Sequence, residues 1–292
     1  MSTDEKLRWE ARFRRPAAAA AFASGVLLLV GTVLGQSILE DRPGTRPLPD
    51  FLLSVDKSPG TLIASGILQA LAGLCLIAVF YYLFRAVVHR TEAIPSWFVY
   101  LVFAGPLMYA ISQIVGAVDR VDVAHTFAHG MPTVGDCPAP HGGARGEECA
   151  QDLLRDSSSP AAIALGLAGS VATAFLFVML PLRARRVGLL SQFMGILGPV
   201  VGALLVLQLI PVVPVVIEAF WLGAVGALFL GVWPRGRGPA WETGEAEPWP
   251  GARGVLAGQA GSAAPGEPDR PEPEPEAAPQ RRSSRKRRRK KR

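Results

Sequence analysis

The sequence predicts an all-α integral membrane protein, a six-helix transmembrane bundle with a disordered cytoplasmic C-terminal tail. Half of the 292 residues are apolar and only 18% are charged, against about 25% charged in a typical soluble domain. The mean hydropathy is +0.29. This composition excludes a disordered chain, a collagen-like fibre, a small disulfide framework and an ordinary soluble enzyme.

The apolar residues fall in blocks of about 20 residues. A helix rising about 1.5 Å per residue needs this length to cross a ~30 Å hydrocarbon layer. Six blocks are predicted to span the membrane: 16–39, 60–84, 95–118, 160–182, 189–210 and 213–233. Backbone polar groups in lipid must be paired within their own segment, so each block is predicted to be a helix. Small residues four apart, such as Gly31 and Gly35, indicate close helix packing, either within one chain or in a homo-oligomer.

The distribution of basic residues predicts the orientation of the transmembrane domain, 16–233. The N-terminal segment 1–15 and the turns after spans two, four and six contain twelve Lys and Arg residues. The opposite side has six, spread over longer loops with eleven acidic residues. Because cytoplasmic loops are enriched in Lys and Arg, a multi-pass protein of the cell membrane with both termini in the cytoplasm is expected.

Two extracytoplasmic loops follow from this topology. The longer one, 119–159, contains Cys137 and Cys149, which are predicted to form a disulfide on the oxidising side of the membrane. The shorter loop, 40–59, contains four prolines that are expected to break any regular element. Its apolar residues 51–53 are expected to pack back onto the bundle or lie at the interface.

Four residues at the start of the longer loop form a candidate metal site. Asp119, Asp122, His125 and His129 step by three, three and four, so a helix continuing from span three places them on one face. Carboxylates and imidazoles bind zinc and similar divalent ions, and His141 is a further candidate ligand. The alternative is a solvated acidic face, because ligands from a single helix seldom enclose a metal. No other cofactor is predicted.

The polar residues inside the spans are few, and Glu218 is the one acid among them. An ionisable group in a span is a functional-site hypothesis because its burial in lipid is costly. The predicted site is an outward-open polar cavity formed by residues near the same end of their spans, namely Glu218, Gln69, Gln113, Tyr109 and Gln208. The alternative, which the sequence favours, is that these side chains join helices by hydrogen bonds.

Catalysis is not required by any motif. None of the four histidines lies in a span, and the sequence contains no H-E-x-x-H and no Walker A motif, which leaves no recognisable catalytic residue. The sequence therefore favours a protein that is not an enzyme.

Residues 234–292 are predicted to be a disordered, Pro-rich tail, because such a composition buries too little surface to offset chain entropy. Its basic end is predicted to bind anionic lipid at roughly 1 kcal/mol per residue near the surface. Non-specific nucleic-acid binding is the alternative, and no specific nucleic-acid recognition is expected. The lipid-binding residues are Arg281, Arg282, Arg285, Lys286, Arg287, Arg288, Arg289, Lys290, Lys291 and Arg292.

With its six blocks and the segment GPAWETGEAEPWP at 238–250, the chain resembles uncharacterised multi-span membrane proteins of actinobacteria over residues 16–250. The resemblance implies a similar helical bundle and brings no activity or catalytic residue. The sequence slightly favours a structural or interaction role in the membrane. The alternatives are a small-molecule transporter or ligand sensor that uses the polar cluster, and a divalent-metal-binding membrane protein.

Overall fold

The computed structural model describes residues 2–38, 48–91, 94–129, 144–157, 160–207, 213–234, 237–247 and 249. The chain divides into two units, residues 1–249 and 250–292, and the description below concerns the first. The described residues form helices and turns without a strand. The prediction of an all-helical protein is therefore confirmed.

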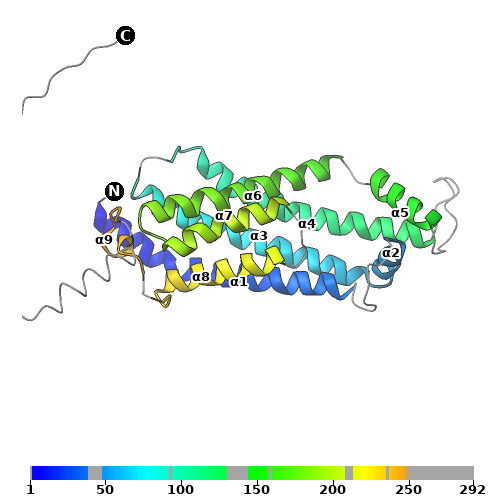
Figure 1. Ribbon diagram of the computed structural model, residues 1–292, viewed down its shortest axis with the longest axis horizontal. Coiled ribbons are helices and arrows are strands. Elements are labelled where there is room, and N and C mark those ends of the chain that lie inside the picture. Colours follow the sequence, from blue (N-terminus) through cyan, green and yellow to red (C-terminus); the bar gives the residue numbers. More distant parts are fainter. Residues whose placement is uncertain are drawn as a thin grey trace, which may run out of the picture. The chain divides into compact units, whose positions relative to one another are not determined.

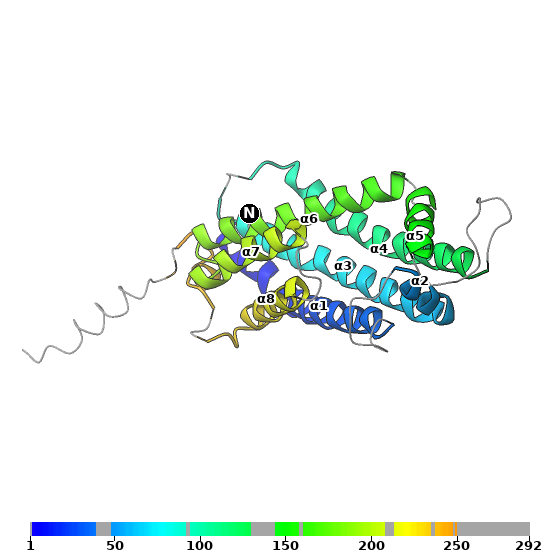
Figure 2. The same cartoon turned by 45° about the vertical axis from the view of Figure 1, so that its right-hand side comes forward.

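The helices form a closed ring in which each element packs on the next one along the chain (Figures 1 and 2). The ring consists of α1 (Thr3–Ser37), α3 (Pro59–Val88), α4 (Phe98–His129), α6 (Pro160–Arg186), α7 (Gln192–Leu207) and α8 (Val213–Leu230). It closes because α8 packs on α1, and α3 also touches α6 across the interior. The described ranges contain three further, short helices: α2 (Leu48–Lys57), α5 (Ala144–Ser157) and α9 (Ala240–Thr243).

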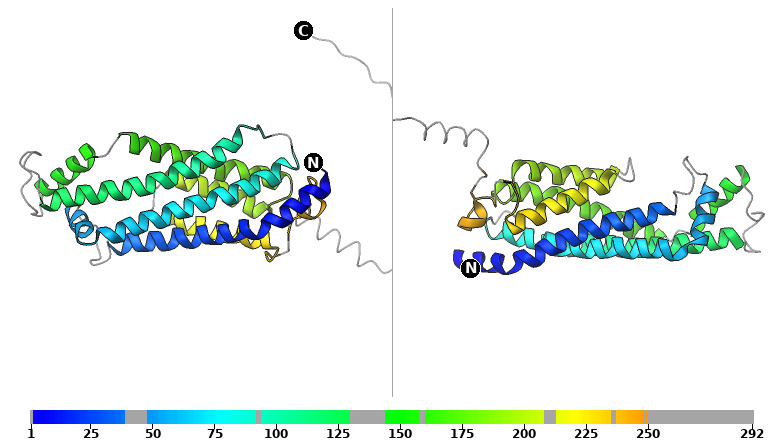
Figure 3. Two further views of the ribbon diagram at one scale, coloured as in Figure 1. Left: turned by 180° about the vertical axis from the view of Figure 1, so that it is seen from behind. Right: turned by 90° about the horizontal axis from the view of Figure 1, so that it is seen from below.

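The two ends of the ring carry different elements. Figure 1 shows the N-terminus and α9 at the left end, named here the α9 end, and α2 and α5 at the right end, named the α2–α5 end. The views from behind and from below in Figure 3 show the same division, with α7 and α8 nearer to the α9 end.

Five helices, α1, α3, α4, α6 and α8, are long and apolar enough to cross a membrane by length and composition. The predicted span 189–210 corresponds to α7, whose 16 described residues are shorter than the ~20 that a bilayer requires. Residues 208–212 between α7 and α8 lie outside the described part of the chain. The number of spans therefore stays a prediction.

The expectation of an irregular loop over 40–59 was wrong for residues 48–57, which form α2. The prolines are compatible with helices because Pro49 lies in the first turn of α2 and Pro59 begins α3, where no backbone N–H has an intrahelical acceptor. Leu52 and Val55 of α2 are fully buried, in a core that includes Phe127 of α4. The predicted packing of this segment back onto the bundle is thus confirmed.

The predicted beginning of the disordered tail at 234 was also too early, because residues 237–247 pack on the α9 end of the bundle. Trp241 is only 3% exposed, and its Nε1 donates a hydrogen bond of 2.9 Å to the carbonyl of Leu189. Its ring lies nearly parallel to that of Tyr82, with centroids 5.7 Å apart. A short segment of weak helical tendency is ordered here by burial of one large aromatic side chain.

A buried ion pair lies beneath α9. Glu10 of α1 and Arg90, two residues beyond the end of α3, have side chains that are 3% and 0% exposed, and Arg90 Nη2 donates to Glu10 Oε2 at 2.9 Å. The same guanidinium donates to the carbonyl of Ala240 from Nε at 3.1 Å and from Nη2 at 2.6 Å. His89 Nδ1 lies 3.5 Å from Glu10 Oε1. Arg90 therefore joins α1, α3 and α9.

We predict that Arg90→Ala lowers the stability of the bundle by about 3–5 kcal/mol, because it leaves the Glu10 carboxylate buried without its cation. The measurement is the thermal unfolding midpoint of the purified protein in detergent. Arg15→Ala, at an exposed position of α1, is the control and should change the midpoint little. Equal midpoints for the two variants would contradict the stabilising role of the pair.

We predict that Trp241→Ala lowers the free energy of unfolding by about 3–5 kcal/mol and releases the segment 237–247 from the bundle. Trypsin should then cleave after Arg237 faster than in the unchanged protein, as followed by mass spectrometry. Trp97→Ala removes an indole that is 57% exposed and should leave the cleavage rate unchanged. If cleavage after Arg237 is equally fast in all three proteins, Trp241 does not hold the segment.

Candidate functional site: a polar cavity

A cavity of about 410 Å³ lies within the ring, beside the N-terminal halves of α6 and α8. The structure places four of the five residues of the predicted polar site in its wall: Gln69 of α3, Tyr109 and Gln113 of α4, and Glu218 of α8. The fifth, Gln208, lies outside the described residues. The cavity is further lined by Arg120, Ser170, Thr173, Leu204, Leu205, Pro214 and Val215.

Close contact between α4 and α6 positions two sides of this cavity. A Cβ atom added at Gly169 of α6 would lie 2.5 Å from the backbone N of Tyr109, so a larger residue there would push the helices apart. Ser170 and Thr173 follow Gly169 on α6 and reach the same space as Tyr109. A small residue thus allows backbone contact, as in other helix pairs that pack in lipid.

The wall of the cavity contains two buried polar groups. Thr173 is 2% exposed, and its Oγ1 is buried without a partner among the described residues. Glu218 is 4% exposed and lines the same cavity. Buried polar groups are usually paired, so the hydroxyl of Thr173 is available to a ligand beside the carboxyl group of Glu218.

The amide of Gln69, in contrast, is held in place. Its Nε2 donates a hydrogen bond of 3.2 Å to Ser65 Oγ, and that hydroxyl donates in turn to the carbonyl of Gly31 at 2.7 Å. The bond to Ser65 lies within α3 and holds the amide nitrogen of Gln69. The bond that joins α3 to α1 is the one from Ser65 to Gly31, so the sequence-based alternative, polar side chains that join helices, applies to Ser65.

Aromatic rings pack together on the α9 side of Thr173 and Glu218. Phe177 follows Thr173 by one turn of α6, and Trp221 follows Glu218 by one turn of α8. The ring of Phe177 packs edge-on against Phe80 at 5.0 Å and against Trp221 at 5.2 Å. Trp221 Nε1 donates to the carbonyl of Met194 at 3.2 Å, which ties α8 to α7.

A second cavity of about 460 Å³ adjoins the first, and the two share Gln113, Arg120 and Ser170 in their walls. It runs along α4 and α6 past Asp119 to Leu154 of α5. Together the two cavities lead from Glu218 toward the α2–α5 end. The polar cavity thus adjoins a second one, whose wall includes the exposed side chains of Ile163 and Leu167.

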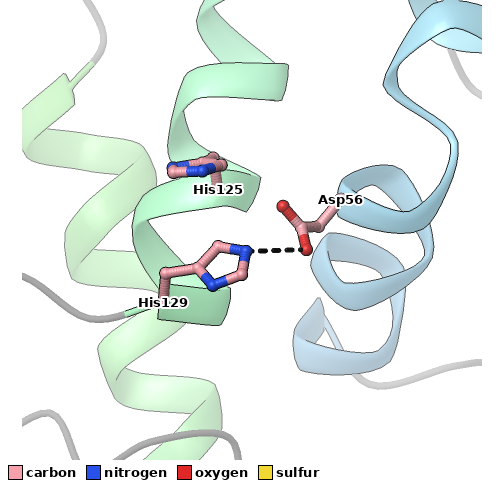
Figure 4. A group of neighbouring side chains, drawn as sticks. All are labelled: Asp56, His125 and His129. Carbon is pink, nitrogen blue, oxygen red and sulfur yellow. Dashed lines mark ion pairs between the residues drawn. The ribbon is translucent and has the colours of Figure 1, made fainter.

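The structure brings together two of the four predicted metal ligands, His125 and His129, and leaves Asp119 and Asp122 apart from them. The helix through them is confirmed, because α4 continues to His129, and His125 and His129 lie together with ring centroids 4.5 Å apart. Asp122 is exposed and Asp119 lines the second cavity, and neither belongs to the histidine group. That group instead contains Asp56 of α2, as Figure 4 shows.

Several other predicted residues lie outside the described part of the chain. They are Cys137, His141 and the ten basic residues of 281–292. Cys149 of α5 is buried and is not a free cysteine, whereas Cys75 is free. The pairing of Cys137 with Cys149 stays a prediction.

Sequence reasoning missed Thr173, Arg120 and Asp56. Thr173 looks like an ordinary small residue of an apolar span, and only its burial opposite Glu218 makes it notable. Arg120 was counted as a loop residue, although it lies in the continuous helix α4. Asp56 was missed because the segment around it was expected to be irregular.

Comparison with known proteins gives no further guide to the site. No family model, curated protein or solved structure matches the chain.

We predict that Ser170→Cys, in a Cys75→Ala background, reacts with a small water-soluble cationic methanethiosulfonate, because Ser170 lines both cavities. Ser24→Cys in the same background is the matched control, since the hydroxyl of Ser24 is fully buried and bonded to the carbonyl of Ala72. Mass spectrometry of membranes treated with the reagent measures the labelling. Equal labelling of the two variants would contradict a water-accessible cavity.

Proposed function

We propose that this chain is a multi-pass protein of the cell membrane that binds a small polar molecule in the cavity around Glu218. In this proposal α7 and its continuation form the fifth of six spans, both termini lie in the cytoplasm, and the cavity opens toward the outside. The excess of Lys and Arg near the α9 end supports this orientation. Binding from the outside corresponds to the ligand-sensor or transporter alternative.

The observation that carries the proposal is that two buried polar groups lie in the wall of the same cavity: the hydroxyl of Thr173, which has no partner among the described residues, and the acid Glu218. An unpaired buried hydroxyl costs roughly 1–3 kcal/mol, and an acid in a membrane helix costs more still. A ligand in the cavity that bonds both groups would offset these costs.

The lining indicates the chemistry of the ligand. The Glu218 carboxyl group is matched by a ligand with an amine or hydroxyl donor, and the Thr173 hydroxyl both donates and accepts. Leu204, Leu205 and Val215 offer apolar contact, which is the usual mixture in small-molecule sites. A volume of about 410 Å³ is within the range of about 300–1,000 Å³ for such sites. We therefore propose a small amine or amino alcohol.

The sequence slightly favoured a structural or interaction role, whereas the cavity favours the binding of a small molecule. Polar groups that only joined helices would bond across the helix contact, as Ser65 of α3 does with the carbonyl of Gly31 of α1, and would leave no space between them. The remaining proposals from the sequence are unaffected by the cavity. They are kinship with actinobacterial membrane proteins, and binding of anionic lipid by the basic residues of 281–292.

We predict that ethanolamine, choline or putrescine raises the unfolding midpoint of the protein in lipid nanodiscs, and that Glu218→Gln weakens the binding at least about tenfold, the loss expected for a charge-assisted hydrogen bond. Thr173→Val should weaken it less, since it removes a neutral hydrogen bond. Isothermal titration with the most stabilising amine measures the dissociation constants.

Glu245→Gln is the matched control, because Glu245 is exposed at the α9 end, and this variant should bind like the unchanged protein. Two results would overturn the proposal. One is that none of the amines shifts the midpoint of the unchanged protein, and the other is that Glu218→Gln binds the amine as well as Glu245→Gln does.

A further inference from the structure

Three side chains from two helices converge at the α2–α5 end, where His125 and His129 follow Arg120 of the cavity wall by five and nine residues along α4. His125 and His129 are one turn apart on α4, and Asp56 comes from the facing helix α2 (Figure 4). One ligand atom from each of the three lies within 4.8 Å of the others. His129 Nε2 is 3.4 Å from Asp56 Oδ2. No other group of three or more His, Cys, Asp or Glu side chains in the described ranges is arranged in this way.

We propose that Asp56, His125 and His129 form a binding site for a divalent transition-metal ion, with Zn²⁺ as the ion that fits best. Two imidazoles and one carboxylate are a common protein contribution to zinc sites in which water completes the tetrahedron. Ca²⁺ and Mg²⁺ prefer sets of oxygen ligands, so the two imidazole nitrogens select against them. The site lies outside the cavity and does not depend on the function proposed for it.

Packing beneath the three side chains supports the geometry. Leu52 and Val55 of α2 are fully buried against the core that contains Val123 and Phe127 of α4. Asp56 follows Val55, and Phe127 lies between the two histidines in the sequence. The apolar contacts hold the two helices side by side, so the ligands require little rearrangement to reach a common ion. A metal site built on packed helices is better defined than one on loops.

Exposure of the group leaves room for the water ligand. The side chain of His129 is 61% exposed and that of Asp56 is 21% exposed, and His125 is exposed as well. An ion can enter from solvent, and at least one coordination position stays open after the three protein ligands are bound. An open position is typical of exchangeable or catalytic zinc, whereas structural zinc usually has four protein ligands.

Helix α2 supplies what a site on α4 alone would lack, a ligand from a second helix. Ligands from one helix seldom surround an ion, and Asp119 and Asp122 were the only acids considered together with the histidines. The structure replaces them by Asp56, which approaches from the opposite side. Because the two sets of residues differ in their acids, substitution of Asp56 and of Asp122 distinguishes the inter-helix site from the single-helix site.

The experiment is isothermal titration of the full-length protein, in detergent and free of affinity tag and metal, with Zn²⁺. We expect one equivalent to bind with a submillimolar dissociation constant. Asp56→Asn and His125→Ala should each weaken binding at least about tenfold, because loss of a first-sphere ligand costs no less than loss of a supporting group. Asp122→Asn, the matched control on the same helix, should bind like the unchanged protein, and so should Glu218→Gln.

The proposal is overturned if the unchanged protein binds Zn²⁺ no tighter than millimolar. It is also overturned if Asp56→Asn binds as tightly as Asp122→Asn does, in which case Asp56 and His129 form an ion pair only. Circular dichroism of each metal-free variant verifies that it is folded. As a second measurement on the unchanged protein, Co²⁺ should give the intense visible absorption of a tetrahedral site, and an excess of Mg²⁺ should leave that absorption unchanged.

Discussion

A polar group kept away from water is costly unless it finds a partner, and the buried acids of this bundle, Glu10 and Glu218, lie in different surroundings. At the α9 end, the buried carboxylate of Glu10 is bonded to Arg90, and the same guanidinium bonds the carbonyl of Ala240. Near the other end, the buried hydroxyl of Thr173 lacks a partner among the described residues. Unpaired buried atoms occur at the α9 end too, among them both ring nitrogens of His89. The region around Thr173 differs because this hydroxyl and the buried acid Glu218 lie in the wall of one cavity, which is where a ligand is expected.

The aromatic side chains separate these two regions. Phe80, Phe177 and Trp221 fill the interior where α3 touches α6, and the layer continues through Tyr82 and Phe229 to Trp241. Aromatic rings contribute both buried area and preferred edge-to-face geometry. They pack tightly only because small residues let the helices approach, as Gly198 of α7 does where an added Cβ would lie 2.4 Å from Pro181 of α6.

Features set by one segment alone could be predicted from the sequence, whereas those that depend on distant contacts could not. Length and hydropathy identify the long helices, and an acid in an apolar block identifies Glu218, around which the topology then gathers Gln69, Gln113 and Tyr109. The ion pair of Glu10 with Arg90 joins residues 80 positions apart, and neither is unusual in a basic segment near a membrane. Helix α2 and Trp241 are ordered by burial against the bundle, which overrides the prolines that suggested irregular chain.

The same layer bears on whether a bound molecule could cross the bundle. Passage would require Phe177 to part from Phe80 and Trp221, and Trp221 is tied to α7 by its hydrogen bond to Met194. Movement of α8 would also disturb Phe229, whose ring packs against Trp241 and Tyr82. Trp241 is itself hydrogen-bonded to the carbonyl of Leu189. The neighbouring residue, Ala240, is hydrogen-bonded to Arg90. Each of these contacts would have to be broken or remade within one transport cycle, with no polar path visible beyond Glu218 among the described residues. Binding at one face therefore demands less of this structure than transport does, and a ligand sensor is the form of the proposed function that the packing favours.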